Sequence, residues 1–219
     1  MVEVSTSLLS VKKENIIQTI YNLEVAGTNY FHIDVMDGKF VEENTSELMN
    51  EYCEYLNTIS NTPIDVHLMV QDVESYIKNY LIYNPNIITL HYETIKEKNK
   101  IMELIKYVKQ NNCKIGISIK PETKIEEIYE FLPYIHLVLI MTVKPGKGGQ
   151  KLIPETIEKI KALKNYLDLK NLEIDIEADG GINIENVQQL KDAGANIVVV
   201  GTSIINSENY KDTIQKLKL

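Results

Sequence analysis

The sequence predicts an α/β protein built as a single-domain (β/α)8 barrel, the TIM-barrel architecture, over residues 1–219. Strand-like and helix-like segments alternate from one end of the chain to the other, which is typical of parallel strands joined by helices. Eight such pairs follow one another without a linker or a low-complexity stretch. Polar residues also follow several of the strands, which is where a barrel of this kind carries its chemistry.

The predicted strands are short runs of β-branched and other apolar residues that end in turn residues. The sixth is a continuous apolar run, typical of a strand buried on both faces. The eight are predicted over Val2–Leu8, Tyr30–Val35, Ile64–Leu68, Ile87–His91, Lys114–Ile119, His136–Thr142, Glu173–Ala178 and Ala195–Val200.

The predicted helices have apolar residues at a spacing of three or four, as Ile16, Ile20 and Leu23 do in the first. They are predicted over Glu14–Ala26, Glu47–Leu56, Val73–Tyr83, Lys98–Gln110, Ile125–Leu132, Pro154–Tyr166, Ile184–Ala193 and Glu208–Leu217. An open doubly wound sheet is the alternative fold. It is disfavoured because no G-x-G-x-x-G motif follows the first strand.

The composition excludes several classes of partner. The formal net charge of −8 argues against nucleic-acid and membrane partners. All 23 basic residues are lysine, so anions must be held by backbone N–H groups or ammonium groups. The two cysteines have no metal-binding spacing, and no signal peptide or membrane span is found, so we expect a cytoplasmic protein with reduced thiols. The composition is compatible with a homo-oligomer.

Four ionisable residues at predicted strand ends are candidate metal ligands. His32 and Asp34 lie on one face of the second strand, His67 ends the third, and Asp179 follows the seventh. Two imidazoles and two carboxylates suit one divalent ion of zinc, iron, manganese or cobalt. Spacing alone leaves a metal site and purely structural roles about equally open. His91 also ends a strand, and its role stays open.

Three glycine-containing segments follow the last three predicted strands. Glycines let backbone N–H groups approach an anion closely, and barrels often bind phosphate in these late loops. Phosphate binding is therefore favoured over plain turn chemistry. The residues are Gly146, Lys147, Gly148 and Gly149, then Gly180 and Gly181, then Gly201 and Thr202.

Several motifs together resemble the ribulose-phosphate 3-epimerase family. They are Ser7-Leu8-Leu9-Ser10, His32-Ile33-Asp34-Val35-Met36-Asp37-Gly38, Asp65-Val66-His67-Leu68-Met69, Met141-Thr142-Val143-Lys144-Pro145-Gly146, Gly148-Gly149-Gln150 and Asp179-Gly180-Gly181-Ile182. The resemblance runs in order along almost the whole chain. It implies an isomerase of the pentose phosphate pathway that inverts C3 of D-ribulose 5-phosphate to give D-xylulose 5-phosphate, and a phosphorylated ketose as the small-molecule partner.

The resemblance also implies roles for individual residues. His32, Asp34, His67 and Asp179 would bind one metal ion, and Asp34 and Asp179 would also be the two acid/base groups. The substrate contacts would come from Ser7, His67, Met36, Met69 and Met141, with the phosphate held by Gly146, Lys147, Gly148, Gly149, Gly180, Gly181, Gly201 and Thr202. Without the resemblance, the methionines fit adaptable packing better.

The chain departs from the family pattern in two loops. After the second strand it reads Phe40-Val41-Glu42-Glu43 where a Pro-Asn pair is usual, and Lys144 and Lys147 stand in the glycine loop where Asn and Phe are usual. Other segments are similar to the D-allulose-6-phosphate 3-epimerase branch, which would share the chemistry on a longer sugar. Two further alternatives are a catalytic-lysine barrel, for which Lys120 is the candidate, and a non-catalytic phosphate-binding barrel.

Overall fold

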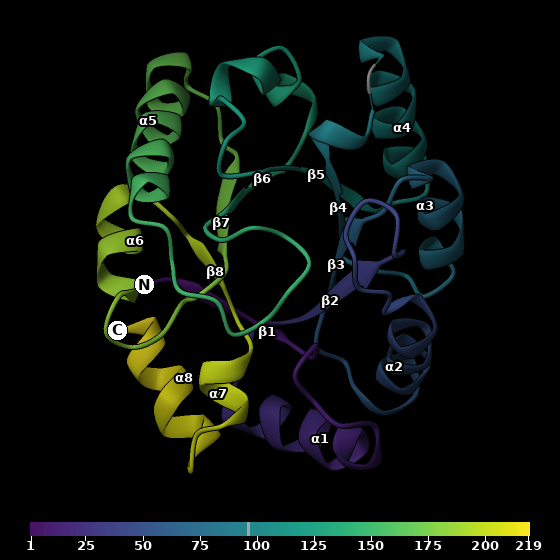
Figure 1. Ribbon diagram of the computed structural model, residues 1–219, viewed down its shortest axis with the longest axis vertical. Helices are drawn as coiled ribbons and strands as arrows, with labels where there is room; N and C mark the ends of the chain where they lie inside the picture. The colour runs from purple at the N-terminus through teal and green to yellow at the C-terminus, as the bar shows by residue number, and fades with distance from the viewer. Residues whose placement is uncertain (96) are drawn as a thin grey trace.

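The computed structural model describes residues 1–95 and 97–219. In these residues, eight parallel strands close into a barrel in which each strand pairs with the next along the chain and β8 returns to β1. Figure 1 shows the helices arranged around the strands, with the long segment between β6 and α5 crossing in front of the barrel. The predicted (β/α)8 fold is therefore confirmed.

The strands are β1 (Glu3–Ser7), β2 (Tyr30–Met36), β3 (Ile64–Met69), β4 (Ile87–His91), β5 (Lys114–Ile119), β6 (Leu137–Met141), β7 (Asp175–Asp179) and β8 (Ile197–Val200). The α-helices are α1 (Ile16–Ala26), α2 (Ser46–Ile59), α3 (Val73–Leu81), α4 (Lys98–Gln110), α5 (Glu155–Lys170), α6 (Val187–Ala193), α7 (Thr202–Ile205) and α8 (Tyr210–Lys218). Short 3₁₀ turns are η1 (Lys13–Asn15), η2 (Tyr92–Thr94), η3 (Ile125–Ile128) and η4 (Leu132–Tyr134).

One predicted helix is wrong. Ile125–Leu132 folds as η3, and η4 follows it, instead of forming one α-helix. Pro133 lies in the first turn of η4 and has no backbone N–H, so an α-helix could not continue past this segment. The buried residues Ile125, Ile128 and Phe131 are three apart, a spacing that also fits the three-residue turn of a 3₁₀ helix. The prediction also lacked α7, because four residues are too short to show a helical period.

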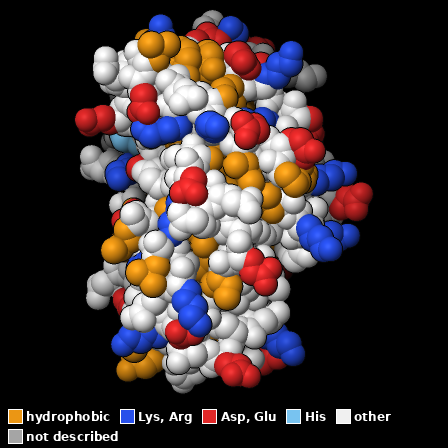
Figure 2. All heavy atoms as spheres, turned by 90° about the vertical axis from the view of Figure 1, so that its left-hand side faces the viewer, with side chains coloured by type: hydrophobic (Ala, Val, Ile, Leu, Met, Phe, Trp, Pro, Cys, Tyr) orange, Lys and Arg blue, Asp and Glu red, His pale blue; other side chains and the backbone are white. Residues whose placement is uncertain are grey.

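The outer surface of the barrel is formed by amphipathic helices. Figure 2 shows one face, on which lysine and acidic side chains are interspersed with small hydrophobic groups. Ion pairs one helical turn apart, such as Lys164 with Asp168 and Lys216 with Asp212, belong to this solvated layer. Among the described residues, no helix combines the length and apolar character that crossing a bilayer requires.

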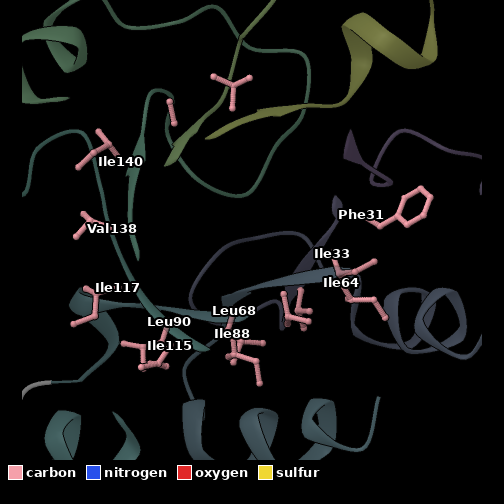
Figure 3. Close-up of a cluster of buried hydrophobic side chains, with 14 of the residues drawn as sticks. Phe31, Ile33, Ile64, Leu68, Ile88, Leu90, Ile115, Ile117, Val138 and Ile140 are labelled. Carbon is pink, nitrogen blue, oxygen red and sulfur yellow. The ribbon is translucent and has the colours of Figure 1, made fainter. Parts of the chain in front are cut away.

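The main hydrophobic core lies between the strands and the helices. Outward-pointing side chains such as Phe31, Ile33, Leu68 and Ile117 are fully buried there, and Figure 3 shows them lying away from the barrel axis. Because side chains alternate along a strand, packing these residues outward turns their sequence neighbours inward. His32 and Asp34 are therefore directed into the barrel by the hydrophobic residues on either side of them.

The barrel interior is unusually polar. A small apolar cluster occupies part of it, formed by Ile87, Leu137, Leu139, Met141, Val143 and Ile197. The other buried inward positions include Ser5, His32, Asp65, Thr89, Ser118 and Glu177. Burying polar groups is costly unless they are paired, so this interior points to a functional role at the adjacent barrel mouth.

Candidate active site

Four predicted ligand residues converge at the carboxyl-terminal ends of the strands. His32 and Asp34 come from β2, His67 from β3 and Asp179 from β7. One ligand atom from each lies within 4.8 Å of those from the other three. Strand register contributes directly, because Asp34 pairs with His67 across the β2–β3 ladder.

The atoms that face this cluster suit a cation. His32 Nε2 lies 3.4 Å from Asp34 Oδ1, and His67 Nδ1 lies 3.7 Å from Asp34 Oδ1 and 3.5 Å from Asp179 Oδ2. Both ring nitrogens are buried and have no hydrogen-bond partner among the described residues. Two unpartnered imidazole nitrogens beside two carboxylates form a mixed nitrogen and oxygen donor set that fits a divalent metal ion.

Neighbouring residues fix the orientation of these side chains. Asp65 Oδ2 lies 2.6 Å from His32 Nδ1 and accepts a hydrogen bond from the Ser5 hydroxyl at 2.8 Å. The Ser7 hydroxyl donates to Asp34 Oδ2 at 2.7 Å. Asp34 therefore keeps Oδ1 toward the two histidines, while its Oδ2 is held by Ser7.

The pKa values in this cluster reflect strong mutual attraction. Burial acts to lower the pKa of His32, but the negative charges of Asp65 and Asp34 outweigh it and raise that pKa well above its usual value. Burial acts to raise the pKa of Asp34, and the two histidines outweigh it, so that pKa is lowered. The resting site therefore favours an ionised Asp34.

His91 lies behind the cluster, on the side of His67 away from the two aspartates. Its Nε2 lies 3.0 Å from His67 Nε2, and its Nδ1 lies 2.9 Å from Glu93 Oε2. Burial lowers the pKa of His91 to about 4. The sequence left this residue open because the contact depends on how β3 and β4 lie side by side, which no local motif encodes.

Asp37 is a second residue whose role sequence reasoning missed. Its carboxylate accepts hydrogen bonds from the backbone N–H groups of Lys39, Phe40 and Gln71 at 2.9, 2.9 and 2.7 Å. It therefore ties the loop after β2 to the loop after β3. A carboxylate directly before a glycine turn was the available signal, since Asp side chains commonly bond to nearby backbone N–H groups.

A pocket of about 300 Å³ opens above the cluster, at the barrel mouth. Asp34 and Asp179 reach its surface, whereas His32 and His67 are not among its lining residues. The other predicted substrate residues all line it: Ser7, Met36, Met69, Met141, Gly146, Lys147, Gly148, Gly149, Gly180, Gly181, Gly201 and Thr202.

The pocket wall on one side is made of backbone. Gly146, Gly149, Gly180 and Gly181 all have φ values between +68° and +122°, which L side chains rarely adopt. The Gln150 amide donates to the carbonyl oxygens of residues 144 and 147 and so holds the loop in a tight curve. These glycines allow the backbone to form a concave surface suited to an anion.

Lys120 does not line the pocket. Its Nζ lies over the ring of Phe40, 4.2 Å from the ring centre. This position offers no support for a lysine-based reaction in the pocket.

Comparison with known proteins gives a consistent result. The model of the Ribulose-phosphate 3 epimerase family matches residues 3–205. A protein named ribulose-phosphate 3-epimerase from Bacillus subtilis strain 168 is 33% identical over 219 residues, covering 100% of this chain and 99% of that protein. One of the same name from Synechocystis is 33% identical over 211 residues, covering 96% and 90%.

Solved structures with little sequence similarity share the fold. KGPDC from Streptococcus mutans superposes with a TM-score of 0.72 at 10% identity, covering 100% of this chain and 96% of that one. A 3-hexulose-6-phosphate synthase gives 0.72 at 11% identity, covering 99% and 98%. At this identity the likeness concerns the barrel architecture alone.

Proposed function

The chain belongs to the ribulose-phosphate 3-epimerase family, and from this premise we propose that Asp34 and Asp179 exchange the C3 proton of ribulose 5-phosphate beside one divalent metal ion. The protein is an isomerase that epimerises a phosphorylated ketose. The observation that carries the proposal is that both carboxylates belong to the four-residue cluster and also line the pocket above it.

The reaction needs a base on each face of the sugar. The C3 proton lies next to the C2 ketone, so its removal leaves an enediolate. The chemistry that a divalent ion supplies when bound by His32, Asp34, His67 and Asp179 is Lewis-acid stabilisation of this negative charge. One carboxylate takes the proton from one face, and the other returns a proton to the opposite face, giving D-xylulose 5-phosphate.

The rest of the pocket would hold the substrate in place. The backbone around Gly146–Gly149, Gly180–Gly181 and Gly201–Thr202 would bind the phosphate, with Lys147 adding positive charge. Met36, Met69 and Met141 would pack against the reacting carbons, and Ser7 would keep Asp34 in position. Binding energy at the phosphate end then helps to orient C3.

The metal and the location are part of the same proposal. Zinc, iron, manganese and cobalt all accept two imidazoles and two carboxylates. The buried, free thiols of Cys53 and Cys113 agree with a reducing, cytoplasmic compartment.

The test is to incubate the metal-loaded protein with D-ribulose 5-phosphate in D₂O and follow C3 by NMR. We expect xylulose 5-phosphate that carries deuterium at C3. Absence of both exchange and product would contradict the proposal for the pentose. A parallel sample with D-allulose 6-phosphate shows whether the longer sugar is also accepted.

Two variants test the assigned bases. We expect Asp34→Asn and Asp179→Asn each to lower kcat by about 10² to 10⁴-fold, because each removes one proton-transfer group. Asp192→Asn, at an exposed position of α6, is the matched control and should turn over normally. If either active-site variant retained normal kcat, that residue would not be one of the two bases.

A further inference from the structure

A series of hydrogen-bonded side chains connects the metal-facing cluster to a carboxylate that does not face the pocket. It starts at His67, passes through His91 and ends at Glu93. Both histidines are fully buried, and Glu93 is 18% exposed at its side chain. Neither His91 nor Glu93 lines the pocket, so the epimerase chemistry itself leaves both without a role.

The rings of His67 and His91 are nearly parallel and approach each other most closely through their Nε2 atoms. Their planes differ by 22° and their centroids are 5.0 Å apart, while the two Nε2 atoms approach to 3.0 Å. Carbon atoms of stacked rings rest at about 3.5 Å or more, so the short approach of the nitrogens indicates an in-plane N–H···N hydrogen bond. One of the two Nε2 atoms must then carry the proton.

The hydrogen bonds of Glu93 determine which of the two Nε2 atoms carries the proton. Glu93 Oε1 accepts hydrogen bonds from the backbone N–H of Lys120 at 2.7 Å and from the Thr123 hydroxyl at 2.6 Å, and its Oε2 faces His91 Nδ1. A carboxylate accepts only, so His91 carries its proton on Nδ1 and presents a lone pair at Nε2. His67 then donates from Nε2.

We infer that Glu93 and His91 are positioning residues that hold His67 in the Nε2–H form, so that its Nδ1 lone pair would be available to bind a metal ion. This inference rests on the proposed metal centre and adds to it the residues that make His67 able to act as a ligand. His67 Nδ1 is the ring nitrogen without a hydrogen-bond partner in the described structure, and it faces Asp34 and Asp179.

Phe40 completes the arrangement from the loop after β2. Its ring centre lies 4.9 Å from that of His91 at an angle of 50°, and Lys120 lies on Phe40 in turn. The loop that departs from the family pattern therefore contributes Phe40, which covers the contact between His91 and His67. Excluding water keeps the two histidines bonded to each other instead of to solvent.

The test is the affinity for Zn²⁺, measured by chelator competition on metal-stripped and reloaded protein. We expect His91→Leu and Glu93→Gln to weaken Zn²⁺ binding by about 10 to 100-fold, the usual cost of removing a partner of a metal-ligating histidine. His91→Gln places an amide oxygen near the former Nε2 and should recover most of the affinity. Glu126→Gln, at an exposed position of η3, should bind Zn²⁺ as the wild type does.

A second readout does not depend on activity or on any variant folding. The chain has only four histidines, so ¹⁵N–¹H NMR of the Zn²⁺-loaded wild type can assign each ring. We expect the proton on Nε2 of His67 and on Nδ1 of His91. Wild-type Zn²⁺ affinity in folded His91→Leu, or the opposite tautomers, would overturn the inference. A wild type that does not bind Zn²⁺ at His32 and Asp34 would instead overturn the metal centre itself.

Discussion

At the scale of single residues, His32 and His67 turn different ring nitrogens toward the cluster. His32 presents Nε2 and bonds Asp65 through Nδ1, whereas His67 presents Nδ1 and contacts His91 through Nε2. Each ring is thus fixed at the nitrogen that faces away from the cluster. A mobile imidazole would lose rotational freedom on binding an ion, and these contacts remove that freedom in advance.

Replacement of Asp65 should show how much its hydrogen bond to His32 contributes to metal affinity. Asp65→Ala removes the acceptor for His32 Nδ1 at 2.6 Å, and we expect about 10 to 100-fold weaker metal binding, measured by chelator competition. Asp65→Asn keeps one oxygen able to accept from both His32 and Ser5, so it should fall between Ala and the wild type. Equal metal affinity in all three proteins would show that Asp65 does not position His32.

The four clustered residues could be predicted because each belongs to a short motif at the end of a strand. His91 could not, although it also ends a strand. Its contact with His67 requires β4 to lie beside β3 in a register that pairs His67 with Thr89, and it also requires both side chains to point inward. Such a contact depends on the pairing of two strands, and no sequence motif within either strand predicts it.

At the scale of elements, the loops at the barrel mouth support one another through close backbone contacts. A Cβ on Gly181 would lie 2.4 Å from the backbone nitrogen of Leu152, and a Cβ on Gly146 would lie 2.8 Å from Cβ of Val41. The loops after β2, β6 and β7 therefore form one packed layer. Glycine is required at these contacts because any side chain would push two loops apart.

Gly181→Ala should disturb this layer and the phosphate end of the pocket. Beyond the clash, φ of +68° at residue 181 costs an L residue about 1–2 kcal/mol, and we expect KM to rise about tenfold or more. Gly27→Ala is a matched control, because φ there is +86° but nothing lies within 4 Å of the added Cβ. It should lower the free energy of unfolding by about 1–2 kcal/mol and leave KM unchanged.

Steady-state kinetics and urea unfolding of the two variants separate local strain from pocket damage. An unchanged KM in Gly181→Ala would mean that the loop after β7 takes no part in holding the phosphate.

Element types were predictable where hydrophobic periodicity was strong. The bounds of α4 and β4 agree with the sequence patterns to the residue, because a regular apolar stripe and an apolar run define them. The segment from residue 125 to 132 has a similar apolar spacing, yet it folds as 3₁₀ turns. A spacing of three is compatible with both an α-helix and a 3₁₀ turn, so periodicity predicts which face is buried more reliably than which helix type forms.

At the scale of the whole molecule, the barrel is closed by the pairing of the first strand with the last. Residues Glu3 to Thr6 of β1 pair with Ile197 to Val200 of β8, and α8 packs against both β1 and α1. A closed sheet has no free edge in the described structure, so each strand is held on both sides. Opening one strand pair therefore weakens its neighbours, and we expect the barrel to unfold as a unit.

The two free cysteines can report on this cooperativity. Cys53 lies on α2 and Cys113 precedes β5, and burial raises the pKa of each thiol to about 12. At pH 8 only about one thiol in 10⁴ is then a thiolate, the form that attacks a disulfide reagent, so the folded protein should resist labelling by DTNB. Cys53→Ser leaves only Cys113 to be labelled, and Cys113→Ser leaves only Cys53. In increasing urea, we expect DTNB to label the two variants at the same rate, because one unfolding event exposes both thiols. Faster labelling of Cys113 than of Cys53 under native conditions would show instead that the β5 side of the barrel opens alone, ahead of the α2 side.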